Sequence, residues 1–270
     1  MTDLILGIDG GGTSCRAAVA RPDGTVLGRG KSGAANILTD PNNAIISITE
    51  AAKAAYRDAG LDEAGVSGLA YADQLGMAMA AVATESARIG DGADLQARGI
   101  ISRVNRLATA CGVVPGMPAR EAAELLRQAP WPHTTPPAKG ESRHEIDGAV
   151  CADSATLLLP ADRDRIVATG SHGALNSYKA TAPFRPLLLM FNDAGFGADR
   201  GGVLALPELD REGIAAIAVA AQSARIGDGR STLQDGTISD VNTTAYRLGA
   251  RVGASALALA RTLAEKSGRS

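Results

Sequence analysis

Three apolar stretches in the second half of the chain each run into a polar loop that contains glycine, at residues 170–173, 192–195 and 223–229. Histidine titrates near neutral pH and can act as a general acid or base, whereas arginine can hold a carboxylate or phosphate through two parallel hydrogen bonds. If the loops meet, their side chains could therefore bind and transform a small anion. The candidates are Ser171, His172, Asn192, Asp193, Ser223, Arg225 and Asp228.

Within this set, His172 and Asp193 are the candidates for catalysis, His172 as acid or base and Asp193 as the group that orients it or binds a metal ion. A structural role is the alternative for two others, because Asp228 lies between two glycines and can hold a tight turn with Arg225 as its ion-pair partner. Ser171 is a poor candidate for a nucleophile, since Gly-Ser-His-Gly lacks the Gly-x-Ser-x-Gly pattern. The residues that would bind the anion are Ser171, Asn192, Ser223, Arg225 and Asp228.

The elements that would position these loops alternate between apolar strands and helices. Continuous apolar strands that alternate with helices favour a parallel sheet covered on both faces. Ligands of such sheets bind at the carboxyl ends of the strands, which is where all three loops lie. Strands are predicted at 165–169, 187–191 and 214–221, and helices at 204–212, 238–248 and 254–266.

The heptapeptide Ser-Ala-Arg-Ile-Gly-Asp-Gly occurs twice, at 86–92 and at 223–229, and identical residues continue on both sides of it. With roughly half of the aligned positions identical, most of the chain reads as a duplicated unit. For the first copy we expect a strand at 76–83, a helix at 100–108 and a second helix from Pro118. No Gly-Ser-His-Gly precedes the first heptapeptide, so only the second copy could hold a complete site.

A second candidate site lies near the start of the chain, where a predicted strand at 4–8 runs into a glycine turn at 9–13. Three successive glycines leave backbone N–H groups uncovered, and such a concavity can hold a phosphate. Asp9 could hold Mg²⁺ through water, and Thr13 could add a hydroxyl group. A plain glycine hairpin is the alternative. Further strands are predicted at 16–20 and 25–28, followed by a helix from Asp40 to Gly60.

The start of the chain resembles the N-terminal segment of the N-acetylglucosamine/glucosamine kinase and BadF/BadG-type ATPase family. The resemblance is carried by residues 6–13, 16–19, 23–24, Gly28 and 32–37. That family has the acetate kinase–sugar kinase–Hsp70–actin fold. The resemblance implies that ATP and Mg²⁺ are the cofactors, with Asp9 as the metal-binding residue. It also implies that the phosphates are bound by Asp9 and by the backbone amides of Gly10, Gly11, Gly12 and Thr13.

The fold class we expect is α/β, with an N-terminal actin-like strand meander plus helix, followed by a duplicated doubly wound unit. Its parts are a sugar-kinase/ATPase-like segment at 1–65, a first, incomplete repeat at 66–130, a linker at 131–147 and a second repeat at 148–270. The first functional hypothesis is an ATP-dependent phosphotransferase of the amino-sugar kinase or ATPase type, complete or incomplete. The alternatives are an enzyme or binding module for a small anionic metabolite at the three loops, and an inactive chimaera or remnant.

Composition limits the partners. The net charge of −2 gives no reason to expect binding to nucleic acid, and no apolar run approaches the roughly 20 residues that span a bilayer. We expect no signal peptide, since no basic lead precedes residue 4. The three cysteines Cys15, Cys111 and Cys151 are scattered, which favours reduced thiols and a cytoplasmic protein. The expected partners are a small-molecule substrate, either an amino sugar or a small anion, and a second copy in a homodimer.

Overall fold

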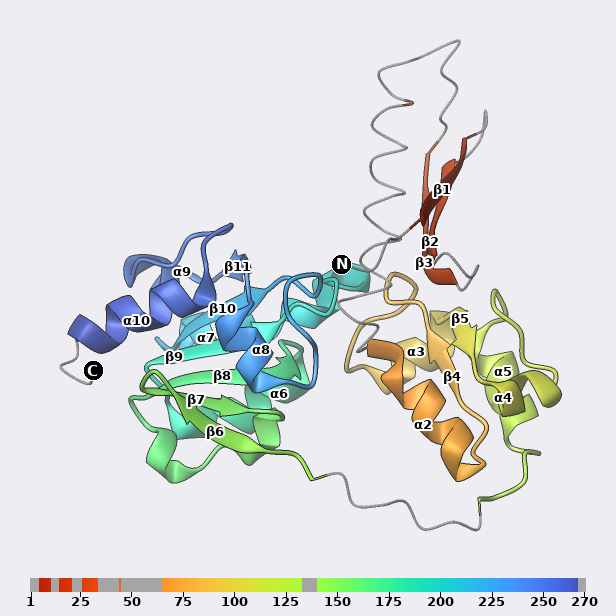
Figure 1. The fold of residues 1–270 in the computed structure, drawn as a ribbon, viewed down its shortest axis with the longest axis horizontal. Coiled ribbons are helices and arrows are strands. Elements are labelled where there is room, and N and C mark those ends of the chain that lie inside the picture. Colours follow the sequence, from red (N-terminus) through yellow and green to blue (C-terminus); the bar gives the residue numbers. More distant parts are fainter. Residues whose placement is uncertain are drawn as a thin grey trace. The chain divides into compact units, whose positions relative to one another are not determined.

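The computed structural model describes residues 5–10, 15–20, 26–33, 44, 65–132 and 140–266 (Figure 1). The chain divides into two compact units, Met1–Glu63 and Ala64–Ser270. Among the helices of the described residues, none has the length and apolar content that a membrane crossing requires.

The first unit contains an antiparallel sheet of β1 (Ile5–Gly10), β2 (Cys15–Ala20) and β3 (Val26–Ser32), in that spatial order. The predicted meander is therefore present. Cys15 and Ala17 of the central strand are buried, whereas residues 5–9 of the edge strand β1 are exposed. The turn at 11–14 and, apart from residue 44, the helix predicted at 40–60 lie outside the described residues.

The second unit is built on a six-stranded sheet in the order β11-β10-β9-β8-β7-β6. The four central strands are parallel to one another, and an antiparallel strand lies at each edge. This arrangement confirms the expected parallel sheet, since β8, β9 and β10 are the three predicted apolar strands. The strands are β6 (Arg143–Ile146), β7 (Ala149–Ala152), β8 (Ile166–His172), β9 (Leu188–Asn192), β10 (Ala215–Val219) and β11 (Ile238–Val241).

Both faces of this sheet are buried under helices, which is why the central strands are apolar along their whole length. On one face Met190 packs in a cluster with Leu233 and Leu263, and on the other Phe191 packs with Leu206. The α/β class with a doubly wound sheet is therefore confirmed. The helices are α6 (Leu175–Thr181) and α7 (Ala205–Arg211) on the Phe191 face, and α8 (Gly229–Gln234), α9 (Thr243–Arg247) and α10 (Ala256–Lys266) on the Met190 face.

The elements before the six-stranded sheet follow the same order as α7, β10, α8, β11, α9 and α10. In both series the two strands pair antiparallel with a register shift at the same step. The earlier elements are α2 (Ser67–Leu75), β4 (Ala80–Val82), α3 (Gly92–Arg98), β5 (Ile101–Val104), α4 (Arg106–Ala110) and α5 (Ala119–Leu126).

The helices predicted at 100–108 and 238–248 are wrong, because each segment forms a strand followed by a short helix. The cause is an asparagine, Asn105 or Asn242, whose side chain caps the short helix. The same side chain also accepts a backbone N–H from Met79 just before β4, or from Ala216 in β10. The segment 131–147, predicted to be a linker, contains the strand β6. Its polar residues suit an edge strand, and Arg143 of β6 forms an ion pair with the buried Asp162.

Asn242 joins three elements through its buried amide. Its Oδ1 accepts hydrogen bonds from the backbone N–H of Ala216 at 3.1 Å and of Ala245 at 2.8 Å. Its Nδ2 donates to the carbonyls of Ile214 at 2.8 Å and Leu206 at 3.3 Å. One side chain thereby satisfies polar groups in the first turn of α7, at Ile214 just before β10, in β10 and at the start of α9.

We expect Asn242→Ala to lower the free energy of unfolding by about 3 kcal/mol, because a buried polar group left without a partner costs about 1–3 kcal/mol. Urea unfolding followed by circular dichroism measures this loss. The control is Gln234→Ala on the exposed side of α8, expected to change stability by less than about 0.5 kcal/mol. Equal stability of the two variants would contradict this role for Asn242.

Candidate functional site

The three polar loops meet at the carboxyl ends of β8, β9 and β10. The 223–229 loop lies against the end of β8, where Gly227 N–H donates to the carbonyl of Gly170 at 2.7 Å. The approach is close, since a Cβ on Gly170 would lie 2.4 Å from the backbone nitrogen of Asp228. Gly229 is equally confined, because its Cβ would lie 2.5 Å from the carbonyl oxygen of Ala152. Only glycine permits these backbones to touch.

Asn192 and Asp193, at the end of β9, bind the same loop through buried side chains. Asn192 Nδ2 donates to the carbonyl of Ala224 at 3.0 Å, and Asp193 Oδ1 accepts from Ala221 N–H at 2.9 Å. Asp193 Oδ1 also accepts from Gly195 N–H at 2.8 Å. The structure therefore brings the predicted loops together, and these two side chains hold them in place.

The remaining predicted anion-binding residues also contact backbone. Asp228 is the N-cap of α8, and its carboxylate accepts from Arg230 N–H and Ser231 N–H. Ser223 Oγ donates to the carbonyl of Ala220 and accepts from Thr237 N–H, while Ser171 Oγ accepts from Ala155 N–H. Arg225 is exposed. Among the predicted anion-binding residues, Arg225 is the one whose side chain is exposed to solvent.

His172 ends β8 and is partly buried, opposite Asn192 in the pairing of β8 with β9. Its Nδ1 accepts a hydrogen bond from Ala174 N–H at 3.3 Å, which leaves the proton of the neutral ring on Nε2. Burial lowers the pKa of His172 below its ordinary value, so the ring is neutral at pH 7. No hydrogen bond joins the side chains of His172 and Asp193, both of which are described.

The glycine turn of the first unit is described as far as Gly10. Asp9 is exposed at the end of β1, opposite Arg16 in β2. Desolvation, with a smaller contribution from the charge of Asp9, raises the pKa of the Cys15 thiol. The predicted phosphate-binding residues Gly11, Gly12 and Thr13 lie outside the described residues. Within the described part of the chain, no three His, Cys, Asp or Glu side chains are grouped as metal ligands.

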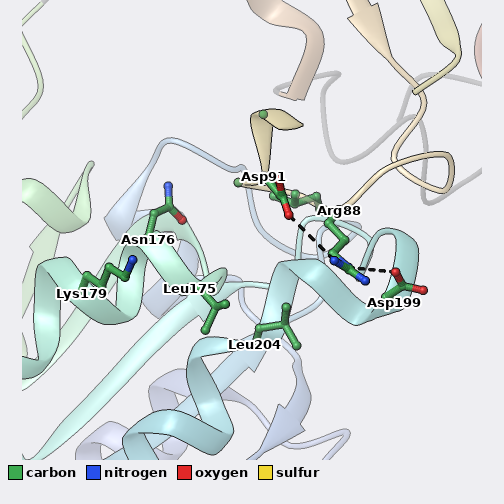
Figure 2. Close-up of a pocket in the computed structure, with 10 residues that line it drawn as sticks. Arg88, Asp91, Leu175, Asn176, Lys179, Asp199 and Leu204 are labelled. Atoms are coloured by element: carbon green, nitrogen blue, oxygen red, sulfur yellow. Dashed lines mark hydrogen bonds and ion pairs between the residues drawn. The ribbon is translucent and has the colours of Figure 1, made fainter. Parts of the chain in front are cut away.

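A cleft that the sequence did not predict lies where the first heptapeptide meets the second half of the chain (Figure 2). Its volume is about 520 Å³. Sequence reasoning missed it because the residues of α6 stand in no motif, and the only signal was the first heptapeptide itself. The lining residues are Arg88, Ile89, Gly90, Asp91, Gly92, Leu175, Asn176, Lys179, Asp199 and Leu204.

Comparison with known proteins supports the resemblance of the N-terminal segment. The model of the BadF/BadG/BcrA/BcrD ATPase family matches residues 6–117, which is less than half of the chain. The N-terminal segment is therefore of the BadF ATPase type, and the match continues beyond residue 65, where the sequence resemblance was expected to end.

Among curated proteins, the chain is similar to the glucosamine kinase of Vibrio cholerae serotype O1, with 45% identity over 56 residues. This stretch covers 21% of the chain and 19% of that kinase, so the chain matches about a fifth of the length of its curated relative. No solved structure matches the chain.

The two heptapeptides provide a matched test of the close backbone approach. We expect Gly229→Ala to destabilise the protein by about 3 kcal/mol, because its Cβ would overlap the backbone of Ala152. At the equivalent Gly92, an added Cβ would have no other atom within 4 Å, and φ is not positive. Gly92→Ala should therefore be neutral or stabilising by up to about 1 kcal/mol. Chemical unfolding measures both, and equal losses would contradict the close approach at Gly229.

The pH dependence of stability should report His172. Its pKa is lower in the folded state than in the unfolded state, so the unfolded chain binds more protons as the pH falls below about 6.5. The free energy of unfolding must then decrease with falling pH, by at most about 1.4 kcal/mol per pH unit for one proton. His172→Asn should flatten this slope below about pH 6.5, whereas Gln234→Ala on the exposed side of α8 should leave it unchanged. An unchanged slope in His172→Asn would contradict the lowered pKa of His172 as the cause of this pH dependence.

Proposed function

We propose that the chain is an ATP-dependent phosphotransferase of the amino-sugar kinase and ATPase type. The observation that carries the proposal is the family match from residue 6, which includes the glycine turn at the end of β1. The amino sugar as acceptor rests on the name of the kinase from Vibrio cholerae. Such an enzyme would act on a small sugar in the cytoplasm, where ATP is available.

The residues at the end of β1 suit the phosphates of a magnesium nucleotide. Asp9 is exposed and has no ion pair with another described residue, so its carboxylate is available to a cation. Mg²⁺ usually keeps several waters and binds proteins through one or two carboxylates plus the phosphates of the substrate. Asp9 would hold the ion, and the amides of residues 10–13 would hold the phosphates. When bound, Mg²⁺ would neutralise charge on the phosphates during transfer.

The proposed reaction transfers the terminal phosphoryl group of ATP to a hydroxyl of the sugar. The bond between that phosphorus and the oxygen bridging to ADP breaks, a bond to the sugar oxygen forms, and the hydroxyl proton is released. The protein's contribution to such a transfer is positioning and electrostatic stabilisation. For the N-terminal unit this means holding the phosphates still at the end of β1.

A second candidate function is a site for a small anion at the loops 170–173, 192–195 and 223–229. The hydrogen bonds that join these loops favour this second function. They hold the loops together as one surface at the carboxyl ends of three parallel strands, where ligands of such sheets bind. His172 would be the acid or base there, and Arg225 would hold the anion. Asp193, with Oδ1 bound to two amides, would position the loop.

We expect Mg·ATP to raise the melting temperature of the full chain, since a ligand of the native state stabilises it by RT ln(1 + [L]/Kd). At ten times Kd this is about 1.4 kcal/mol, or roughly 3–5 °C when about 150–250 residues unfold together. Asp9→Ala should abolish the rise. The control Glu124→Gln, an exposed carboxylate of α5, should retain it.

The outcomes separate the two candidates. A rise that depends on Asp9, followed by release of ADP with glucosamine, supports the phosphotransferase. No rise at millimolar Mg·ATP would contradict it. Small carboxylates and phosphates would then be titrated against the intact protein, His172→Ala and Arg225→Ala, because the site at the three loops predicts weaker binding by both variants.

A further inference from the structure

The strands β4 and β10 have the same local bonds in the two copies of the repeated sequence. Each pairs antiparallel with the strand that follows it, with a register shift at the same step. Asn105 Oδ1 accepts a hydrogen bond from the backbone N–H of Met79 at 3.0 Å. Asn242 Oδ1 accepts in the same way from Ala216 N–H at 3.1 Å. β4 and β10 are therefore equivalent strands, and differences between them come from their surroundings.

The two strands differ at their other edge. β10 pairs in parallel with β9 along its whole length, and all of its residues are buried. β4 belongs to a two-stranded sheet in which β5 is its neighbour, and its residues are partly exposed. Among the described residues, no strand covers the edge of β4 that corresponds to the β9 side of β10. We call this side the open edge of β4.

The contacts of β9 show which groups such an edge offers to a neighbouring strand. Asp193, directly after β9, donates its N–H to the carbonyl of Val219 at 2.8 Å, and its Oδ1 accepts from Ala221 N–H at 2.9 Å. The equivalent groups at the open edge are the carbonyl of Val82 and the N–H of Thr84. Within the part of the chain that the structure describes, these two groups have no hydrogen-bond partner. One acceptor and one donor therefore stand ready for a strand that is followed by an aspartate.

The open edge also lacks charge. Other edge strands of the second unit carry charged residues, which are Arg143 in β6, Arg103 in β5 and Asp240 in β11. Charges on an edge strand disfavour pairing with a further strand. Residues 77–83, which contain β4, include no charged residue. An apolar strand can therefore pair there without burying a charge.

We propose that the open edge of β4 binds an extended segment of a partner protein by strand addition. The segment lies parallel to β4, as β9 lies parallel to β10, and it is apolar and followed by an aspartate. That aspartate donates its N–H to the carbonyl of Val82, and its carboxylate accepts from Thr84 N–H. In this mode of recognition main-chain hydrogen bonds supply affinity and alternate side chains supply specificity. The open edge is distinct from the glycine turn and from the three polar loops.

The sequence of β9 supplies a probe, and amide hydrogen exchange of the full chain, followed by NMR, supplies the readout. The peptide has the sequence of residues 187–195, with lysines added at both ends for solubility. At ten times Kd we expect it to slow the exchange of Thr84 N–H about tenfold. Exchange of Ala221 N–H should not change, because this group already donates to Asp193.

Substitutions at Thr84 and in the peptide test the bond to the aspartate. Ser86 N–H donates to the carbonyl of Ala83 at 3.0 Å, so Thr84 is the second residue of a β-turn, a position that favours proline. Thr84→Pro removes the N–H group and should weaken peptide binding about tenfold. Thr84→Ala keeps the N–H and should bind like the intact protein. The peptide with Asp193→Ala should bind the intact protein and Thr84→Pro equally, because the bond that distinguishes them is then absent from both.

The proposal is overturned if the peptide leaves the exchange of Thr84 N–H unchanged, or if Asp193→Ala in the peptide does not weaken binding to the intact protein. The second of these measurements does not depend on the folding of Thr84→Pro. Slow exchange of Thr84 N–H without peptide would also overturn it. Such protection would mean that another part of the chain covers the open edge or, if it increases with protein concentration, that a second copy does.

Discussion

The second unit depends on the contact of three backbones at Gly170, Gly229 and Ala152. A Cβ on either glycine would lie within 2.6 Å of backbone atoms, so no other residue fits without moving a strand. This approach fixes the 223–229 loop against β7 and β8, and through Asn192 and Asp193 it fixes the end of β9 as well. Close backbone contacts thus fix the positions of the polar loops, whatever chemical role their side chains have.

The central strands could be predicted because burial on both faces requires continuous apolar runs, as in residues 187–191. The spacing of Ile238, Val241 and Ala245 was ambiguous, since it fits a helix as well as a strand followed by a capped turn. Asn242 decides between these two structures, because its side-chain amide forms hydrogen bonds to both β10 and α9. Such a tertiary bond has no signature in local spacing, and the polar edge strand β6 was missed for the same reason.

The convergence of the three loops followed from topology, because parallel strands place their carboxyl ends at one edge. The roles of the polar residues did not follow, since a sequence does not reveal that Asp193 accepts from two amides and Asp228 caps α8. Apart from the first heptapeptide, the sequence held no signal for the cleft. Lys179 and Gly90 are far apart in sequence, and the docking of residues 84–89 on residues 197–201 brings them to one cavity.

The exposed edge of β1 has a consequence for the protein's behaviour in concentrated solution. Ile5, Leu6 and Ile8 are 52%, 37% and 43% exposed, and Asp9 is the single charged residue of the strand. An apolar edge with few charges is a template for strand pairing between molecules. Self-association through this strand would therefore increase with protein concentration while each molecule stays folded. The N-terminal unit would then determine how readily the protein aggregates.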